Sequence, residues 1–301
     1  MKAMASQFKK IVSATLALVL ALLCCSPAMA SATLTSEGDW WNVLLMGCDS
    51  YSTNSHTRSD SMIIVSMNLD TQQVKMTSLM RDTWVPVPGT KSQHRKLTEL
   101  CAVSGPELTI QAIEECFDVS IDDYALISME GVAEVIDLLG GVDIDITESE
   151  RKAINNGLFD LSSLSGMDKV QESGENVHLN GNQATAYARI RKIDNDYVRT
   201  ERQRTVLLAM ANKIKNGASV STLLTVAKVL LNYVETSLST EEIMQIGKLG
   251  LSLDLSTVEE LRLPADGTYE SGMYGNTWCI KPDFEANAEL LNEFIYGTDE
   301  D

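Results

Sequence analysis

Five charged residues border short apolar segments in the first third of the chain, and their types suit a phosphorylated ligand. They are Asp49, Arg58, Asp60, Arg81 and Asp82. A pair of carboxylates supplies the oxygen ligands that Mg²⁺ prefers, and arginine binds phosphate oxygens through two parallel N–H donors. The alternative is that Asp49 and Asp60 are solvated loop residues that pair locally with Arg58.

A second basic group lies between residues 189 and 204, where six of the 24 lysines and arginines occur. They are Arg189, Arg191, Lys192, Arg199, Arg202 and Arg204. Such clustering stands out in a chain with a net charge of −18. The charge itself argues against a general binder of nucleic acids or of anionic membranes.

A helix from 199 to 215 should carry part of this group. At 100° per residue, Arg199 and Gln203 continue the apolar stripe that includes Val206, so both should point inward. Arg204 is expected on the opposite side and Arg202 on the flank. An inward arginine needs a counter-ion, and a helix N-terminus also favours an anion. The competing interpretation is an internal salt-bridge network with Asp194, Asp196 and Glu201.

Three expected strands would bring the first group together. They cover 40–48, 61–69 and 74–80, with a turn at 70–73. With that turn centred between residues 71 and 72, position 81 pairs near position 62, so Arg81 lies beside Asp60. If the first strand runs antiparallel to the second, Asp49 reaches the same sheet end.

The remaining pattern indicates an α/β protein of three layers, in which helices flank both faces of a central mixed sheet. Helices are expected at 108–117, 131–139, 180–188, 199–215, 221–235, 240–249 and 284–296, and further strands at 142–147 and 258–263. No Pro- or Gly-rich linker interrupts residues 38–301, which predicts a single domain with a C-terminal helical and strand extension.

Residues 1–30 have the features of an export signal. Lys2, Lys9 and Lys10 precede an apolar run of about fifteen residues, and Ala28-Met29-Ala30 supplies a cleavage site. The run is shorter than the roughly 20 residues of a spanning helix. We expect a signal peptide cleaved after Ala30, with an uncleaved anchor as the alternative. In both cases the rest of the chain is extracytoplasmic, secreted or membrane-anchored at the cell envelope.

Four cysteines lie outside this segment: Cys48, Cys101, Cys116 and Cys279. Four cysteines allow three disulfide connectivities, of which Cys101 with Cys116 is preferred. No cysteine and histidine spacing indicates zinc.

The charged residues lie within strings that resemble the LytR–CpsA–Psr family of bacterial cell-envelope phosphotransferases. The strings are NVLLMGCDS (42–50), TRSDSMIIVSMN (57–68), TSLMRDTWVPVPG (77–89), SGPELTIQAIEECFDV (104–119), MEGVAEVIDLLGGVDIDI (129–146), HLNGNQATAYARIRKIDNDYVRTERQRTVL (178–207) and WCIKPDFEANAELLNEFI (278–295). Their order and spacing make the resemblance specific over residues 42 to 215.

The resemblance implies transfer of a glycan phosphate from an undecaprenyl-pyrophosphate donor to a peptidoglycan sugar hydroxyl, at the outer leaflet of the membrane. It implies Mg²⁺, or alternatively Mn²⁺, on Asp49 and Asp60. The implied pyrophosphate ligands are Arg58, Arg81, Lys96, Arg189, Arg191, Arg199 and Gln203. Asp82 or Asp196 would accept the proton of the attacking hydroxyl, and Arg81 would offset charge on the transferred group.

Two departures from the family pattern bear on these roles. Tyr51 stands where the family usually has an arginine, and Lys96-Leu97-Thr98 replaces a string that normally begins with lysine and contains asparagine. Three other functions stay open: a pyrophosphatase of lipid-linked donors, a non-catalytic polyprenyl-phosphate binder, and, least favoured, a cysteine transpeptidase.

Overall fold

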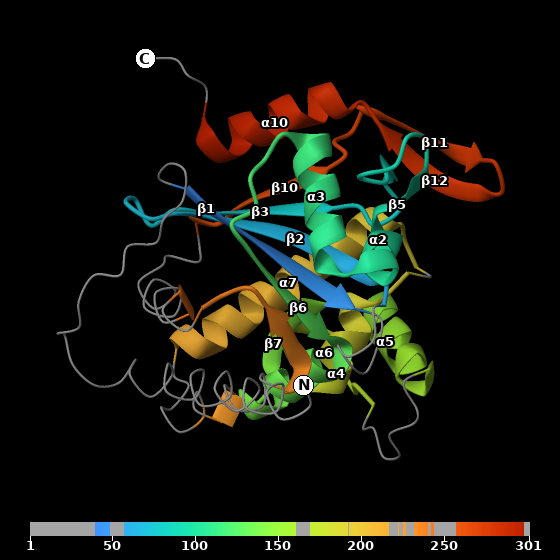
Figure 1. The fold of residues 1–301 in the computed structure, drawn as a ribbon. Helices are drawn as coiled ribbons and strands as arrows, with labels where there is room; N and C mark the ends of the chain where they lie inside the picture. The colour runs from blue at the N-terminus through green and yellow to red at the C-terminus, as the bar shows by residue number, and fades with distance from the viewer. Residues whose placement is uncertain are drawn as a thin grey trace, which may run out of the picture. The chain divides into compact units, whose positions relative to one another are not determined.

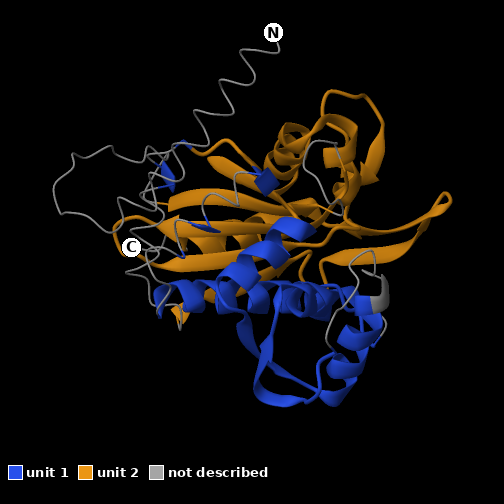
Figure 2. Ribbon diagram, turned by 90° about the horizontal axis from the view of Figure 1, so that it is seen from below, with its two compact units in different colours: residues 1–33, 129–234, 239–255 blue, residues 34–128, 235–238, 256–301 orange. Residues whose placement is uncertain are grey.

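The computed structural model describes residues 40–48, 57–160, 169–191, 193–216, 222, 225–226, 232–239, 242–243 and 257–297. Their contacts group the chain into two compact units, coloured separately in Figure 2. Unit 1 contains residues 129–234 and 239–255, and unit 2 contains residues 34–128, 235–238 and 256–301. The predicted export signal at 1–30 lies outside the described residues.

Unit 2 is built on a mixed six-stranded sheet with the order β10-β3-β2-β1-β6-β9. Its strands are β1 (Trp40–Cys48), β2 (Ser59–Asn68), β3 (Val74–Leu79), β6 (Asp123–Ser128), β9 (Val234–Thr236) and β10 (Glu259–Leu263). β1 runs antiparallel to β2 and parallel to β6, while β10 runs parallel to β3. The predicted α/β class with a central mixed sheet is confirmed.

The β2–β3 hairpin has a register that differs from the prediction. Ile63 pairs with Ser78, so the turn is centred between residues 70 and 71 and position 81 falls opposite position 60. The Asn68 side chain sets this turn, because its Oδ1 accepts bonds from the backbone N–H groups of Asp70 and Thr71 at 3.1 and 2.7 Å. Gln72 then adopts a positive φ of 61°. The prediction was wrong by two positions, and the true register brings Arg81 closer to Asp60.

Three helices of unit 2 contribute to the core on one face of this sheet: α2 (Leu97–Ser104), α3 (Pro106–Phe117) and α10 (Phe284–Tyr296). In Figure 1, α3 and α10 lie above the strands. Leu44, Met46 and Ile64 from the sheet pack with Leu100 and Ile113 from the helices, and all five are buried. The expected helices at 108–117 and 284–296 are therefore confirmed, whereas α2 was missed.

The C-terminal helix α10 is tied to the sheet by polar contacts as well as by its apolar face. Lys75 Nζ donates to the carbonyl oxygen of Phe294 at 2.5 Å and lies 4.9 Å from the centre of the Trp40 ring. A cation at a helix C-terminus is favourable because the last carbonyl groups carry partial negative charge. At the other end, the buried Asn287 side chain accepts from the Ala265 N–H at 2.9 Å.

Two short antiparallel pairs complete unit 2. β4 (Trp84–Pro86) pairs with β5 (His94–Lys96), and β11 (Tyr269–Tyr274) pairs with β12 (Thr277–Pro282) to form a hairpin. Neither pair was predicted, because their sequences lack a clear alternation of apolar and polar residues.

Unit 1 contains the helices α4 (Met129–Leu138), α5 (Glu148–Asp160), α6 (Gly181–Ala188) and α7 (Asp196–Lys215), with a two-stranded sheet of β7 (Val142–Ile146) and β8 (Gly174–Leu179). Its core contains Ile136, Ile144, Ile154, Leu179 and Val206. The expected helices at 131–139, 180–188 and 199–215 are confirmed with shifted starts, and so is the strand at 142–147. The helices expected at 221–235 and 240–249 fall mostly outside the described residues.

All four cysteines, Cys48, Cys101, Cys116 and Cys279, are buried free thiols. The preferred Cys101–Cys116 disulfide is therefore contradicted: both side chains are packed into the apolar core of unit 2 instead. Burial raises the pKa of Cys101 to about 11 and that of Cys116 to about 12. Such thiols have little thiolate at neutral pH, which weakens the transpeptidase alternative for these two residues.

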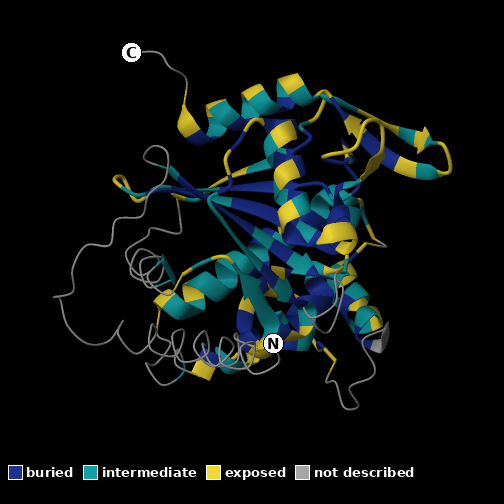
Figure 3. Cartoon of the chain, in the orientation of Figure 1, coloured by how far each residue is buried: buried dark blue, intermediate teal, exposed yellow. Residues whose placement is uncertain are grey.

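No helix in the described part of the chain is long and apolar enough to cross a membrane. Figure 3 shows how exposed and buried residues alternate along the helices, as amphipathic elements require.

The contact between α4 and α6 depends on a glycine. A Cβ atom on Gly181 would lie 2.0 Å from the carbonyl oxygen of Ala133, which belongs to the backbone of α4. The Gly181 N–H also donates to Asp137 Oδ1 at 2.7 Å. Only glycine therefore permits this close approach.

We expect Gly181→Ala to lower the stability of the protein by about 1–3 kcal/mol, because the helices must move apart. Thermal unfolding followed by circular dichroism measures this change. Gly157→Ala in α5 is the matched control, since its Cβ would meet Ala186 Cβ at an ordinary 3.7 Å. A melting temperature unchanged by Gly181→Ala would contradict the packing described here.

Candidate active site and family membership

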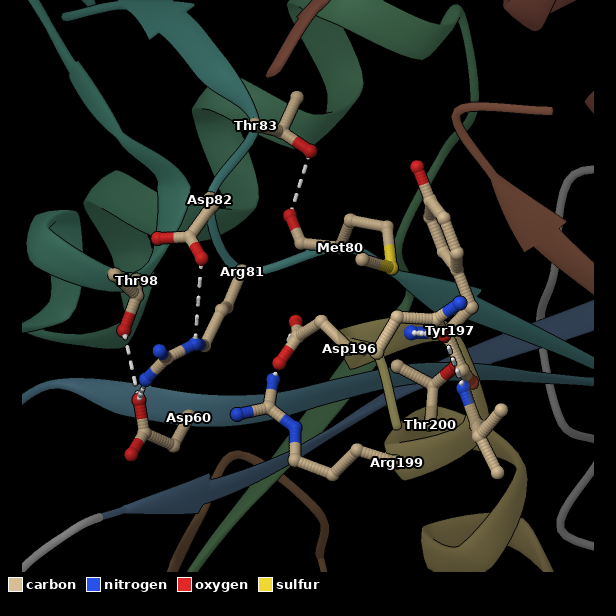
Figure 4. Close-up of polar contacts among 12 residues, drawn as sticks. Asp60, Met80, Arg81, Asp82, Thr83, Thr98, Asp196, Tyr197, Arg199 and Thr200 are labelled. Atoms are coloured by element: carbon tan, nitrogen blue, oxygen red, sulfur yellow. Dashed lines mark hydrogen bonds and ion pairs between the residues drawn. The ribbon is translucent and has the colours of Figure 1, made fainter. Parts of the chain in front are cut away.

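Arg81 and Asp60 form an ion pair at the end of the β2–β3 hairpin, as the register requires. Arg81 Nη1 lies 2.6 Å from Asp60 Oδ1 (Figure 4). Asp60 is in β2 and is 9% exposed. Arg81 is the second residue after the end of β3, and Met80 lies between them. A partly buried pair at this distance is only weakly screened by solvent.

Asp82 extends this pair and brings in Lys96. Asp82 Oδ1 accepts from Lys96 Nζ at 2.7 Å, and Asp82 Oδ2 lies 3.6 Å from Arg81 Nε. Lys96 is positioned because β5 pairs it with Trp84, two residues after Asp82. The predicted lysine therefore joins the site despite the unusual sequence around it.

Helix α2 holds the Arg81 segment from the other side. The backbone N–H groups of Leu97 and Thr98 donate to the carbonyl oxygens of Thr83 and Arg81 at 2.8 and 3.0 Å. These bonds satisfy donors at the helix N-terminus that no capping side chain accepts. The Thr98 Oγ1 hydroxyl also lies 3.4 Å from Asp60 Oδ1. We call Asp60, Arg81, Asp82, Lys96 and Thr98 the Arg81 group.

The hydroxyl of Thr98 was missed in the sequence, because threonine in a helix gives no signal of its own.

Arg58 was predicted to bind phosphate. It is two residues before Asp60 in the sequence, but its ion-pair partner is Glu99, which is not part of the Arg81 group. Its Nη2 is 3.5 Å from Glu99 Oε1, and its side chain is 63% exposed.

In unit 1, Arg199 is almost completely buried, at 1% exposure, as the helical stripe predicted. Its Nη2 lies 2.8 Å from Asp196 Oδ2, one turn earlier on α7 (Figure 4). The helix begins at Asp196, where Asn195 Oδ1 caps the N–H groups of Tyr197 and Val198 at 3.0 and 3.2 Å.

Arg202, expected on the flank of α7, is buried, and Arg204 contradicts the expectation that it lies on the exposed side. They are 3% and 5% exposed. The helical-wheel argument assumed a single buried face, but the first half of α7 is buried on several sides, including Thr200 and Val206. A helical wheel cannot reveal a helix segment that is buried on several sides when the residues there are mostly charged, because the wheel assigns charged residues to the exposed face.

Arg202 is held by two carboxylates. Its Nε donates to Glu150 Oε1 at 2.8 Å, and its terminal nitrogens bond Asp194. Burial alone would lower the pKa of Arg202, but the bonds to Asp194 and Glu150 raise it above its usual value. The salt-bridge alternative is thus correct in part: Asp194 and Asp196 do pair with arginines, and the structure adds Glu150.

The other predicted residues of unit 1 are also placed. Arg189 is the C-cap of α6, and both Arg189 and Arg191 are exposed. Gln203 is half-buried on α7. Lys192 lies outside the described residues.

The predicted metal pair can be described only at Asp60, because Asp49 and Tyr51 lie outside the described residues. Within the described ranges, no group of three or more His, Cys, Asp or Glu side chains could hold a metal ion. Asp60 presents a carboxylate at the sheet end where Cys48, the residue before Asp49, pairs with Ser59. This placement and the oxygen-only donor type fit a hard cation such as Mg²⁺.

Comparison with known proteins identifies the family. The model of the LytR_cpsA_psr family matches residues 26–290. The chain belongs to this family. The resemblance seen in the sequence is confirmed, and the match covers residues of both units.

Two similar proteins of known name are transferases. The chain is 28% identical over 251 residues to the polyisoprenyl-teichoic acid–peptidoglycan teichoic acid transferase TagV of Bacillus subtilis, covering 81% of this chain and 61% of TagV. It is 32% identical over 246 residues to the transferase TagU of Bacillus licheniformis, covering 81% of this chain and 74% of TagU. The chain thus spans less than two thirds of TagV.

Solved structures share the fold. The structure of TagT bound to LIIa-WTA matches with a TM-score of 0.69 and 23% identity, over 88% of this chain and 93% of TagT. The crystal structure of B. subtilis TagV matches with a TM-score of 0.67 and 24% identity, over 87% of this chain and 100% of that chain.

The bond from Arg202 to Glu150 predicts a pH dependence of stability. Burial alone would raise the pKa of Glu150, but the Thr147 N–H and Arg202 lower it below its usual 4.5. The bond therefore stabilises the fold fully above that value, and the contribution is lost as pH falls through the lowered pKa.

We expect Glu150→Gln to reduce stability by about 1.5–3 kcal/mol at pH 7 and by progressively less below pH 4.5. Denaturant unfolding at several pH values measures the difference from the unaltered protein. Glu175→Gln, at an exposed position of β8, is the control and should show little change at any pH. A difference that is constant from pH 7 to pH 3 would rule out this origin.

Proposed function

We propose that this protein transfers a glycan phosphate from an undecaprenyl-pyrophosphate-linked donor to a sugar hydroxyl of peptidoglycan. The observation that carries the proposal is the family match together with relatives named teichoic acid transferases at 28–32% identity. The Arg81 group supports it, because a guanidinium held between two carboxylates is a preorganised anion ligand. We also propose that the reaction takes place outside the cytoplasm, at the outer leaflet of the membrane.

The phosphate contacts proposed in unit 2 are Arg58, Arg81 and Lys96, and those proposed in unit 1 are Arg189, Arg191, Arg199 and Gln203. Phosphoryl transfer depends mainly on positioning and on neutralising charge. Arginine suits both tasks, since its planar fork binds two oxygens of one phosphate at once.

Asp82 has a positioning role in this proposal. Its two oxygens lie against Lys96 and Arg81, so it fixes both cations before the donor arrives. Asp196 fixes Arg199 in the same way. One of these carboxylates would also accept the proton of the attacking hydroxyl.

Asp49 and Asp60 are the proposed ligands of Mg²⁺, with Mn²⁺ as the alternative metal. When bound, the cation would neutralise charge on the two phosphates of the donor. Asp60 also orients Arg81, so this single carboxylate links the proposed metal ligands to the guanidinium.

We expect Arg81→Lys to reduce transfer by about 10²-fold or more, because lysine keeps the charge but cannot form the bidentate contact with phosphate oxygens. The assay follows labelled lipid-linked donor with and without peptidoglycan. Lys152→Ala, at a side chain that is 66% exposed, is the control and should retain full activity.

The products of the same assay separate the alternatives. Label on peptidoglycan indicates transfer, and free glycan phosphate without acceptor indicates a pyrophosphatase. Donor that binds with no turnover indicates a non-catalytic binder, in which case Arg81→Lys would weaken binding alone. Either of the last two outcomes would overturn the proposed transfer.

A further inference from the structure

The β11–β12 hairpin of unit 2 exposes two large apolar side chains side by side. Met273 and Trp278 face each other across the two strands. They are 63% and 46% exposed, and Figure 1 shows the hairpin extending beyond the neighbouring elements of unit 2. Figure 3 shows the exposed and half-exposed residues along its length. Single exposed apolar residues are common on proteins, but a directly paired methionine and tryptophan form a patch.

The tip of the hairpin is also free of charged residues. Residues 271–280, SGMYGNTWCI, contain no Asp, Glu, Lys or Arg, although 22% of the whole chain is charged and its net charge is −18. The nearest charged residues, Glu270 and Lys281, pair with each other at the base of the two strands. The tip itself therefore adds no repulsion at an anionic surface.

The base of the hairpin is joined to the Arg81 group. The Ile280 N–H donates to the Asp82 carbonyl oxygen at 3.0 Å, and Ile280 forms a β-bridge with Thr83. Cys279 and Ile280 are buried, so the hairpin is anchored at this end and exposed at the other. The base of the hairpin is thus held beside Asp82.

Three occupants could cover such a tip, and the observations favour a lipid surface. A second copy of the chain is disfavoured, because two side chains offer far less area than the roughly 800 Å² per partner of a stable interface. A sugar is less favoured, because the residue directly opposite Trp278 is Met273, which lacks the strong hydrogen-bonding groups that bind sugar hydroxyls. Tryptophan and tyrosine are enriched at membrane interfaces, and the tip also carries Tyr274.

We propose that the tip of the β11–β12 hairpin, with Met273 and Trp278, inserts into the headgroup region of the lipid bilayer. It would hold the Arg81 group beside the leaflet that contains a polyprenyl-linked donor. The role of this contact in transfer rests on the proposed function, but the contact itself can be measured without any donor.

The first experiment uses the full chain with vesicles of phosphatidylcholine and phosphatidylglycerol whose acyl chains carry bromine close to the headgroup. Trp278→Phe identifies the emission of Trp278 by difference from the unaltered protein. We expect bromine to quench that difference emission strongly, while the emission that remains in Trp278→Phe is quenched little. Trp278 emission that brominated lipid does not affect would overturn the proposal, whatever segment holds the chain on the vesicle.

The second experiment compares two donors, one embedded in vesicles and one a water-soluble analogue with a short prenyl chain. Met273→Ser combined with Trp278→Ser should raise KM for the embedded donor by about 10²-fold, since each of the two side chains contributes roughly tenfold to partitioning. The kinetic constants for the soluble analogue should not change. Val103→Ser, at an apolar position that is 48% exposed on α2, is the matched control and should alter neither.

Equal effects on both donors would overturn the proposal, because they would show a structural role for the hairpin. If the double variant loses binding to insoluble peptidoglycan, and brominated lipid leaves the Trp278 emission of the unaltered protein unchanged, the tip belongs to a glycan-binding surface and the proposal is overturned. If the unaltered protein transfers neither donor, the proposed function fails, and the quenching experiment still decides the membrane contact.

Discussion

The ion pair between Arg81 and Asp60 is the interaction on which the candidate site of unit 2 depends. Both residues lie where solvent screens them poorly, so removing either would leave a costly uncompensated charge. The pair exists because the turn at Asn68 fixes the register of β2 and β3. The position of a guanidinium at one end of the sheet is thus determined by one side chain at the other end.

Unit 1 also contains buried arginines that need counter-ions, and there they lie on a helix. Arg199 and Arg202 are buried in α7, and Asp196, Asp194 and Glu150 compensate them. In both units, carboxylates therefore hold arginines in place before any anion is bound. An enzyme that stabilises charge through preorganised groups gains from this arrangement, because little reorganisation is needed when the phosphate arrives.

Much of this organisation could be predicted from the sequence. Alternating and continuous apolar segments located β1, β2, β3 and β7, and the family strings located the arginines. The details that failed have physical causes. The turn was misplaced because an Asn side chain, rather than strand length, sets its centre, and Arg204 was misassigned because its helix is enclosed on several sides. Thr98 gave no signal, because only the folded chain brings its hydroxyl to Asp60.

The pairing of the edge strand β10 affects how the protein folds during synthesis. β10 pairs with β3, although about 180 residues separate Glu259 from Lys75 in the chain. The sheet of unit 2 is therefore incomplete until residue 263 has been synthesised, while β3 would display unpaired backbone groups during that interval. Contacts of such long range form slowly and leave nascent chains prone to aggregation. A partner that shields β3 during synthesis would therefore increase the yield of folded protein.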